Sequence, residues 1–76
     1  MKTVKLITQR GWGFLKTAYA NPMADLIDHP GFVQEGEPFI QFDGKHWRLF
    51  RMGPDRIHLP RGKHKSLNAA IVAALN

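Results

Sequence analysis

Cysteine is absent from the 76 residues of this chain, so neither disulfide bonds nor thiolate metal sites can stabilise the fold. Long apolar runs are also missing, and no stretch approaches the roughly 20 residues needed to span a bilayer. The N-terminal residues 1–10 lack the continuous apolar segment of a signal peptide. We therefore expect a complete cytoplasmic protein that makes no membrane contact and folds as a single domain over residues 1–76.

Recognisable catalytic and metal-binding motifs are missing as well. Ser66 is the only serine, and its place before an apolar helical pattern explains it as a helix cap. The chain contains no glycine-rich loop of the Walker or dinucleotide-binding type. The histidines show neither i, i+4 helical spacing nor accompanying cysteines, as a zinc site would require. We therefore expect no catalytic residue, no metal, no cofactor and no small-molecule substrate; the four histidines are His29, His46, His58 and His64.

The chain carries an excess of positive charge that is unevenly distributed. Eleven Lys and Arg residues against six Asp and Glu residues give a net charge of +5. Residues 17–44 contain five acids and no Lys or Arg, whereas residues 45–76 contain seven cations and a single acid, Asp55. This segregation favours an anionic partner for the basic half, unless the acidic and basic segments neutralise each other in the fold.

The clearest local pattern predicts a β-hairpin. Two segments, residues 39–42 and 45–51, flank Asp43-Gly44, which is a typical two-residue hairpin turn. That turn would pair Ile40 with Trp47, and alternate residues would then lie on opposite faces. We assign one face of the hairpin to the core and expect the other face to point outward. The core face holds Ile40, Phe42, Trp47 and Leu49, and the outward face holds Phe39, Gln41, His46, Arg48 and Phe50.

A third strand over residues 56–59 extends this hairpin in the predicted sheet. Its apolar residues Ile57 and Leu59 match the core face of the hairpin, and they would pack near Leu49 and Trp47. The residues that alternate with them, Arg56 and His58, then fall on the outward face.

Weaker patterns predict the N-terminal half. Loose alternation indicates strands over residues 3–8 and 12–19. Asn21-Pro22 is a helix-start pattern, and the short helix would end at Pro30, because a residue before proline is pushed out of the α region. The apolar stripe of this short helix is Met23, Leu26 and Ile27.

A longer helix is predicted at the end of the chain, with Ser66 as its N-cap and an apolar stripe at helical spacing. The stripe consists of Leu67, Ala70, Ile71, Ala74 and Leu75. The predicted fold is therefore α+β: a small antiparallel β-sheet of about four to five strands, with a short inserted helix and a C-terminal helix packed on the sheet.

The outward face of the sheet is the first candidate binding surface. It combines cations with aromatic rings, and such a surface can stack bases while its cations meet phosphates. The alternative is that Phe39 and Phe50 are buried under the predicted first hairpin or the short helix, because phenylalanine is usually buried. The cationic and histidine members of this face are Arg48, Arg56, His46 and His58.

The second candidate is the basic segment at residues 60–65, which leads directly into the C-terminal helix. Unpaired N–H groups at a helix start, with cations beside them, favour phosphate binding. A short basic loop can equally be solvated surface. The cations of this segment are Arg61, Lys63 and Lys65.

Two functional hypotheses follow. In the first, a non-enzymatic protein contacts nucleic acid, or a nucleic-acid-bound complex, through Arg48, Arg56, Arg61, Lys63 and Lys65, with His46, His58 and Phe50 as neighbours. In the second, a small inhibitor or adaptor of the phage or mobile-element type binds a host polymerase, nuclease or defence complex. Its partner surface would then include the acidic residues Asp25, Asp28, Glu35 and Glu37.

Overall fold

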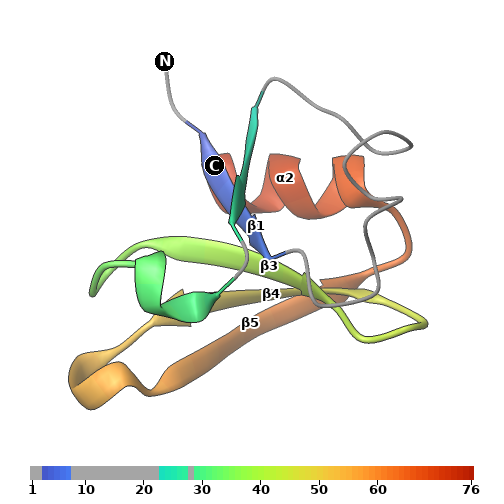
Figure 1. The fold of residues 1–76 in the computed structure, drawn as a ribbon. Helices are drawn as coiled ribbons and strands as arrows, with labels where there is room; N and C mark the ends of the chain where they lie inside the picture. The colour runs from blue at the N-terminus through green and yellow to red at the C-terminus, as the bar shows by residue number, and fades with distance from the viewer. Residues whose placement is uncertain (1–2, 8–22, 28) are drawn as a thin grey trace.

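The computed structural model describes residues 3–7, 23–27 and 29–76 of the chain (Figure 1). Within these residues, five strands form one mixed sheet in the order β2-β1-β3-β4-β5, and one helix covers one face. The predicted α+β class is therefore confirmed. The elements are β1 (Val4–Ile7), β2 (Ala24–Ile27), β3 (Pro38–Phe42), β4 (Trp47–Met52), β5 (His58–His64) and α2 (Leu67–Leu75), with the 3-10 turns η1 (Pro30–Phe32) and η2 (Pro54–Arg56).

The prediction of an antiparallel sheet is wrong for β1. The strand predicted at residues 3–8 is confirmed, but it runs parallel to both of its neighbours, β2 and β3. Among the described strands, β3, β4 and β5 form an antiparallel meander. Parallel neighbours require long connections, and local sequence patterns do not specify such pairings. The strand predicted at residues 12–19 lies outside the described residues.

The predicted short helix is also wrong over the part that the structure describes. Residues Ala24–Ile27 form the strand β2, in which Leu26 lies beside Leu6 of β1. The spacing of the apolar residues fits either a helix or a strand. A two-turn helix is marginal in water, whereas the strand gains a ladder of backbone hydrogen bonds and packs Leu26 against the core. The predicted helix start at Asn21 lies outside the described residues.

The central hairpin is confirmed, with a longer turn than the sequence predicts. Ile40 lies opposite Leu49 instead of Trp47, so residues 43–46 form a four-residue turn. Asp43 accounts for this turn, because its carboxylate accepts hydrogen bonds from the backbone N–H groups two and three residues later. The register moves by two positions, which leaves each side chain within the two strands on its predicted face, while His46 falls in the turn.

The third strand of the meander begins and ends later than predicted. It occupies His58–His64 instead of residues 56–59, because η2 takes up the residues before it. Ile57 precedes the strand and is 53% exposed, and Leu59 is exposed as well, so neither residue joins the core as predicted. The register between β4 and β5 shifts at Arg61, which is the extra residue of a β-bulge.

Apolar packing lies on both faces of the sheet. The C-terminal helix is confirmed as α2, and it buries Leu67, Ala70 and Ile71 on one face. The sheet residues packed there are Val4, Leu6, Ile40, Trp47 and Leu49. A second, smaller cluster lies on the opposite face, because alternation along β3 turns Phe39 away from Ile40. This cluster consists of Ile7, Val33, Phe39 and Met52. In the described part of the chain, no helix is long and apolar enough to cross a membrane.

The start of α2 depends on its predicted cap. The Oγ atom of Ser66 accepts a hydrogen bond of 3.1 Å from the backbone N–H of Ala69. We expect Ser66→Ala to lower the free energy of unfolding by about 1 kcal/mol, because this N–H loses its partner. Urea denaturation measures the change. Ser66→Asp, which retains an acceptor at the cap, is the matched control and should remain close to wild type; equal loss in both variants would contradict the capping role.

Candidate functional site

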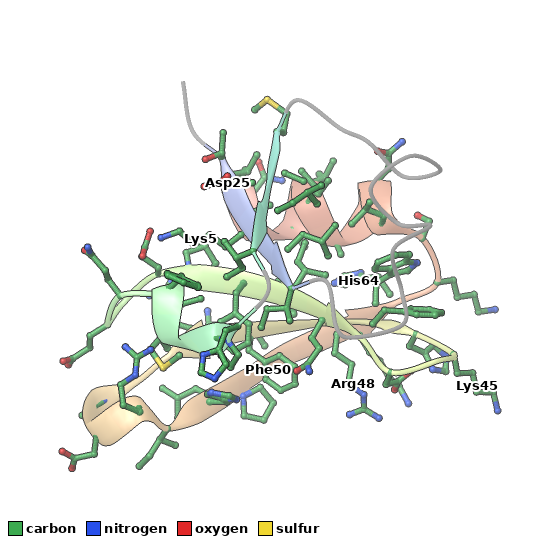
Figure 2. The ribbon with its side chains drawn as sticks, in the orientation of Figure 1. Lys5, Asp25, Lys45, Arg48, Phe50 and His64 are labelled. Atoms are coloured by element: carbon green, nitrogen blue, oxygen red, sulfur yellow. The ribbon has the colours of Figure 1, made fainter. Side chains whose placement is uncertain are left out.

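Strands β4 and β5 bring together a set of side chains on the side of the sheet opposite α2 (Figure 2). Arg48 lies directly opposite Lys63, and two positions further along β4, Phe50 lies opposite Pro60. Alternation along a strand sends these four side chains to the same side. His58 joins them, because its ring contacts Phe50. We call this set the β4–β5 face; it consists of Arg48, Phe50, His58, Pro60 and Lys63.

The aromatic part of the β4–β5 face rests on a buried phenyl ring. Phe39 is 0% exposed, and its ring stacks on Phe50 with centroids 5.3 Å apart and an interplanar angle of 20°. His58 approaches the edge of Phe39, with centroids 5.0 Å apart at 76°. Burial is therefore the correct alternative for Phe39, whereas Phe50 is half-buried and His58 is exposed. The contacts hold the ring of Phe50 in one orientation.

A shallow open depression of about 270 Å³ lies on this face. Phe50 and Pro60 provide apolar lining, while Arg48 and Lys63 provide cationic lining, and Gly62 completes the set. Cavities that bury most of a drug-sized ligand run from about 300 Å³ upward and are enclosed. This depression is better suited to one flat group of a larger ligand than to an entire small molecule.

Arg48 is partly neutralised by a neighbour across the hairpin turn. Its Nε atom donates a hydrogen bond to Oδ2 of Asp43, and its side chain remains 49% exposed. Hydrogen bonds from the backbone N–H of His46, from Arg48 and from the backbone N–H of Lys45 hold the pKa of Asp43 well below its ordinary value. Asp43 is thus ionised at neutral pH, and it competes with any external anion for Arg48. His46 lies in this turn and not on the β4–β5 face.

Lys63 and Lys65 are exposed cations that form no ion pair with any residue the structure describes. Lys63 lies within β5, and Lys65 lies just before the cap of α2. The predicted basic loop at residues 60–65 is therefore mostly strand. As a result, its cations spread along an edge of the sheet and do not gather at the helix start.

Arg61 lies apart from Lys63, because it is the bulged residue of β5. It lines a separate depression of about 70 Å³ beside the end of α2, together with Arg51 and Asn76. Cations near a helix C-terminus interact favourably with the helix dipole. Arg61 and Lys63, which the sequence placed in one basic loop, therefore line different depressions.

Arg56 has a structural role that the sequence did not indicate. Its guanidinium donates hydrogen bonds to the backbone carbonyls of Val33, at 2.7 Å, and Pro30, at 2.8 Å. These bonds hold η1 and the residue after it against η2. The φ angle of Arg56 is 63°, an unfavourable backbone conformation for a side chain of this size that such contacts can maintain. Arg56 therefore lies in η2 and not in the predicted third strand, and its guanidinium is engaged by backbone carbonyls.

The described acidic residues of the second hypothesis lie in different elements, although β2 places Asp25 opposite Lys5, the partner of Glu37. Asp25 is exposed on β2, and Glu35 is exposed in the turn before β3. Glu37 accepts a hydrogen bond of 2.8 Å from Nζ of Lys5, which also donates to the backbone carbonyl of Phe32. Asp28 lies outside the described residues. The alternative in which acidic and basic segments neutralise each other is correct for the pairs Lys5–Glu37 and Asp43–Arg48.

The histidines have different surroundings. Nδ1 of His29 accepts a hydrogen bond of 2.8 Å from the backbone N–H of Gly31 and caps η1. His58 packs on the aromatic rings of the β4–β5 face. Among the described residues, no group of three His, Asp or Glu side chains is placed to hold a metal ion.

Comparison with known proteins found no family model, no curated protein and no solved structure that matches this chain. A function is therefore inferred from the charge, shape and contacts of its own residues.

Three features of the site were not predicted from the sequence. Arg48 lies opposite Lys63 because β5 extends to His64. The predicted third strand ended at residue 59, so it could not place Lys63 beside Arg48. The Asp43–Arg48 ion pair has a sequence signal, since opposite charges flank a hairpin turn. The stacking of Phe39 on Phe50 corresponds to the two residues facing each other across the hairpin, a pairing that the two-residue turn misplaced.

Glu37 gives the fold a defined pH dependence. The hydrogen bonds from Lys5 and from the backbone N–H of Gln34 lower the pKa of Glu37 below its ordinary value of 4.5. A lowered pKa means that the unfolded chain takes up the proton first. The stabilisation is therefore present above the ordinary pKa and is lost as pH falls through the folded-state pKa.

We expect Glu37→Gln to flatten the fall in unfolding midpoint between about pH 6 and about pH 3, because the substitution removes this titrating carboxylate. Urea denaturation at several pH values measures it. Glu35→Gln, which removes an exposed carboxylate in the same turn, is the matched control and should retain the wild-type slope. If the Glu37→Gln profile overlays that of wild type, the carboxylate has no such role.

Proposed function

We propose that this chain is a non-enzymatic, cytoplasmic nucleic-acid-binding protein that contacts nucleic acid, or a nucleic-acid-bound complex, through its β4–β5 face. One observation carries the proposal: Arg48 and Lys63 lie directly opposite each other on neighbouring strands, at a depression that Phe50 also lines. Like charges in directly opposed positions destabilise a strand pair. Asp43 relieves part of this repulsion, and a bound phosphate would relieve the rest.

The other properties of the β4–β5 face also support a nucleic-acid ligand. The depression is open and shallow, so it suits a polymer that passes over the surface better than a small anion that must be enclosed. Aromatic and cationic groups lie side by side, which is the combination that contacts bases and phosphates together. Lys65 adds another exposed cation beyond the end of β5.

The cations available for phosphate contact are fewer than the sequence suggested. Arg56 is held by backbone carbonyls, and Arg61 lines another depression. Lys63 and Lys65 remain, with Arg48 shared between Asp43 and a ligand. Two phosphate contacts predict a log–log salt slope of about −1.4 on single strands, or roughly sevenfold weaker binding over a fourfold rise in salt.

The first test removes single charges from the surface. We expect Lys63→Gln to weaken binding of labelled oligonucleotides and to reduce the magnitude of the salt slope by about 0.7, because one counterion-releasing contact is lost. Fluorescence anisotropy at about 50 and 200 mM salt measures both quantities. Lys45→Gln, a lysine of the hairpin turn outside the depression, is the matched control and should retain the slope. Equal effects of the two variants would argue against the β4–β5 face, and absence of binding by the wild type would refute the proposal.

A second test increases the charge that is available to a ligand. Asp43→Asn retains a side-chain oxygen that can accept hydrogen bonds from the two backbone N–H groups of the turn. The substitution removes the negative charge that pairs with the guanidinium of Arg48. We expect this variant to bind oligonucleotides more tightly than wild type and to show a salt slope near −2.1, because Arg48, no longer shared with Asp43, becomes a full third phosphate contact. Unchanged affinity in a folded Asp43→Asn variant would remove Arg48 from the site.

The second candidate function is an inhibitor or adaptor that binds a protein complex. The observation that favours it is an exposed phenyl ring: Phe32 of η1 is 65% exposed, and the acid Glu35 follows it in an exposed turn. Exposed aromatic side chains are enriched in protein interfaces. In this case the anisotropy titrations show no nucleic-acid binding, and the partner is sought among polymerase, nuclease and defence complexes.

A further inference from the structure

We infer that the depression on the β4–β5 face holds one unpaired nucleotide of a single strand, with its base on Phe50 and Pro60 and its phosphate between Arg48 and Lys63. This inference rests on the proposed function and specifies its ligand. It follows from the register of two neighbouring residue pairs. The cationic pair, Arg48 and Lys63, and the apolar pair, Phe50 and Pro60, lie two positions apart along β4 and share one depression.

The order of these two pairs gives the depression a charged end and an apolar end. Alternate residues of one strand lie about 7 Å apart, which is comparable with the span from a phosphate to its own base. A nucleotide lying along β4 would therefore place its phosphate at the cationic pair and its base at the apolar pair. Neither pair alone distinguishes a nucleotide from any other anion or from any other flat apolar group.

Phe50 is held in place before a ligand arrives. Phe39 stacks on it, and His58 lies against both rings. Because Phe39 is fully buried, the ring of Phe50 has a fixed support. A base that stacks on a ring held in this way loses little affinity to side-chain ordering.

An unpaired base is required because a duplex hides its ring faces. In a double helix, the faces of each base are covered by the bases above and below, so only phosphates and groove edges are exposed. A duplex could therefore use Arg48 and Lys63 but could not stack on Phe50. A flexible single strand can turn one base onto the ring while its phosphate stays at the cationic pair.

The test uses the full chain and three labelled probes of about 12 nucleotides: a single-stranded DNA, the duplex of the same sequence, and a single strand that lacks bases at all positions. By fluorescence anisotropy, we expect wild type to bind the base-containing strand at least fivefold more tightly than the abasic strand. The abasic strand has the same phosphates, so it isolates the contribution of the bases. This comparison needs no variant and does not depend on how a substitution affects folding.

The substitution Phe50→Leu removes the aromatic ring and keeps an apolar side chain. We expect it to weaken binding of the base-containing strand by about fivefold or more, since stacking contributes this much per base, and to leave binding of the abasic strand and the duplex unchanged. Phe32→Leu is the matched control, because Phe32 is an exposed phenylalanine on η1. This control should not change the affinity for any probe.

The outcomes separate this inference from the proposed function. If all three probes bind equally and Lys63→Gln weakens them all, the chain binds nucleic acid through phosphates and the unpaired-base inference is wrong. The same conclusion follows if Phe50→Leu and Phe32→Leu behave alike on the base-containing strand. If wild type binds none of the probes, the proposed function fails together with the inference.

Discussion

The burial of Phe39 is the packing interaction on which the candidate site depends. Phe39 lies on the central strand β3, between β1 and β4, yet its side chain does not belong to the cluster under α2. It packs with Ile7, Val33 and Met52 and supports the rings of Phe50 and His58. The sheet thus has apolar packing on the face opposite α2 as well as on the face that α2 covers. This second packing layer gives β4 and β5 a rigid aromatic surface instead of a fully solvated one.

Two cations hold the segment that contributes Val33 to this cluster. Lys5 donates to the carbonyl of Phe32 and pairs with Glu37, while Arg56 donates to the carbonyls of Pro30 and Val33. Net charge alone could not separate these structural cations from surface ones. In the structure, the cations near η1 donate hydrogen bonds to carbonyl or carboxylate oxygens. Lys63 in β5 and Lys65 just after it form no ion pair with a described carboxylate.

The sequence predicted those elements whose determinants are local. The cap at Ser66 and the helical spacing after it located α2, and the alternating residues around Asp43 located the β3–β4 hairpin and the correct faces. Tertiary pairing decided the rest. Residues Ala24–Ile27 become a strand because β1 lies beside them, and no local pattern specifies a parallel partner. The candidate site was predicted in part: Arg48, Phe50, His58 and Lys63 come together, whereas Arg56 and Arg61 do not.

The form of β5 bears on which type of partner the molecule can bind. An edge strand with unpaired backbone groups invites the addition of a further strand, and proteins prevent this with proline, bulges and lysine. β5, which is an edge of the sheet formed by the described strands, contains all three, as Pro60, the bulge at Arg61 and the exposed Lys63. Addition of a strand from a protein partner is thus disfavoured along this edge. Pro60 and Lys63 also line the depression on the face of the strand. Under the proposed function, the side chains of the β4–β5 face are then the binding surface, which favours a ligand recognised by charge and stacking over one recognised by backbone pairing.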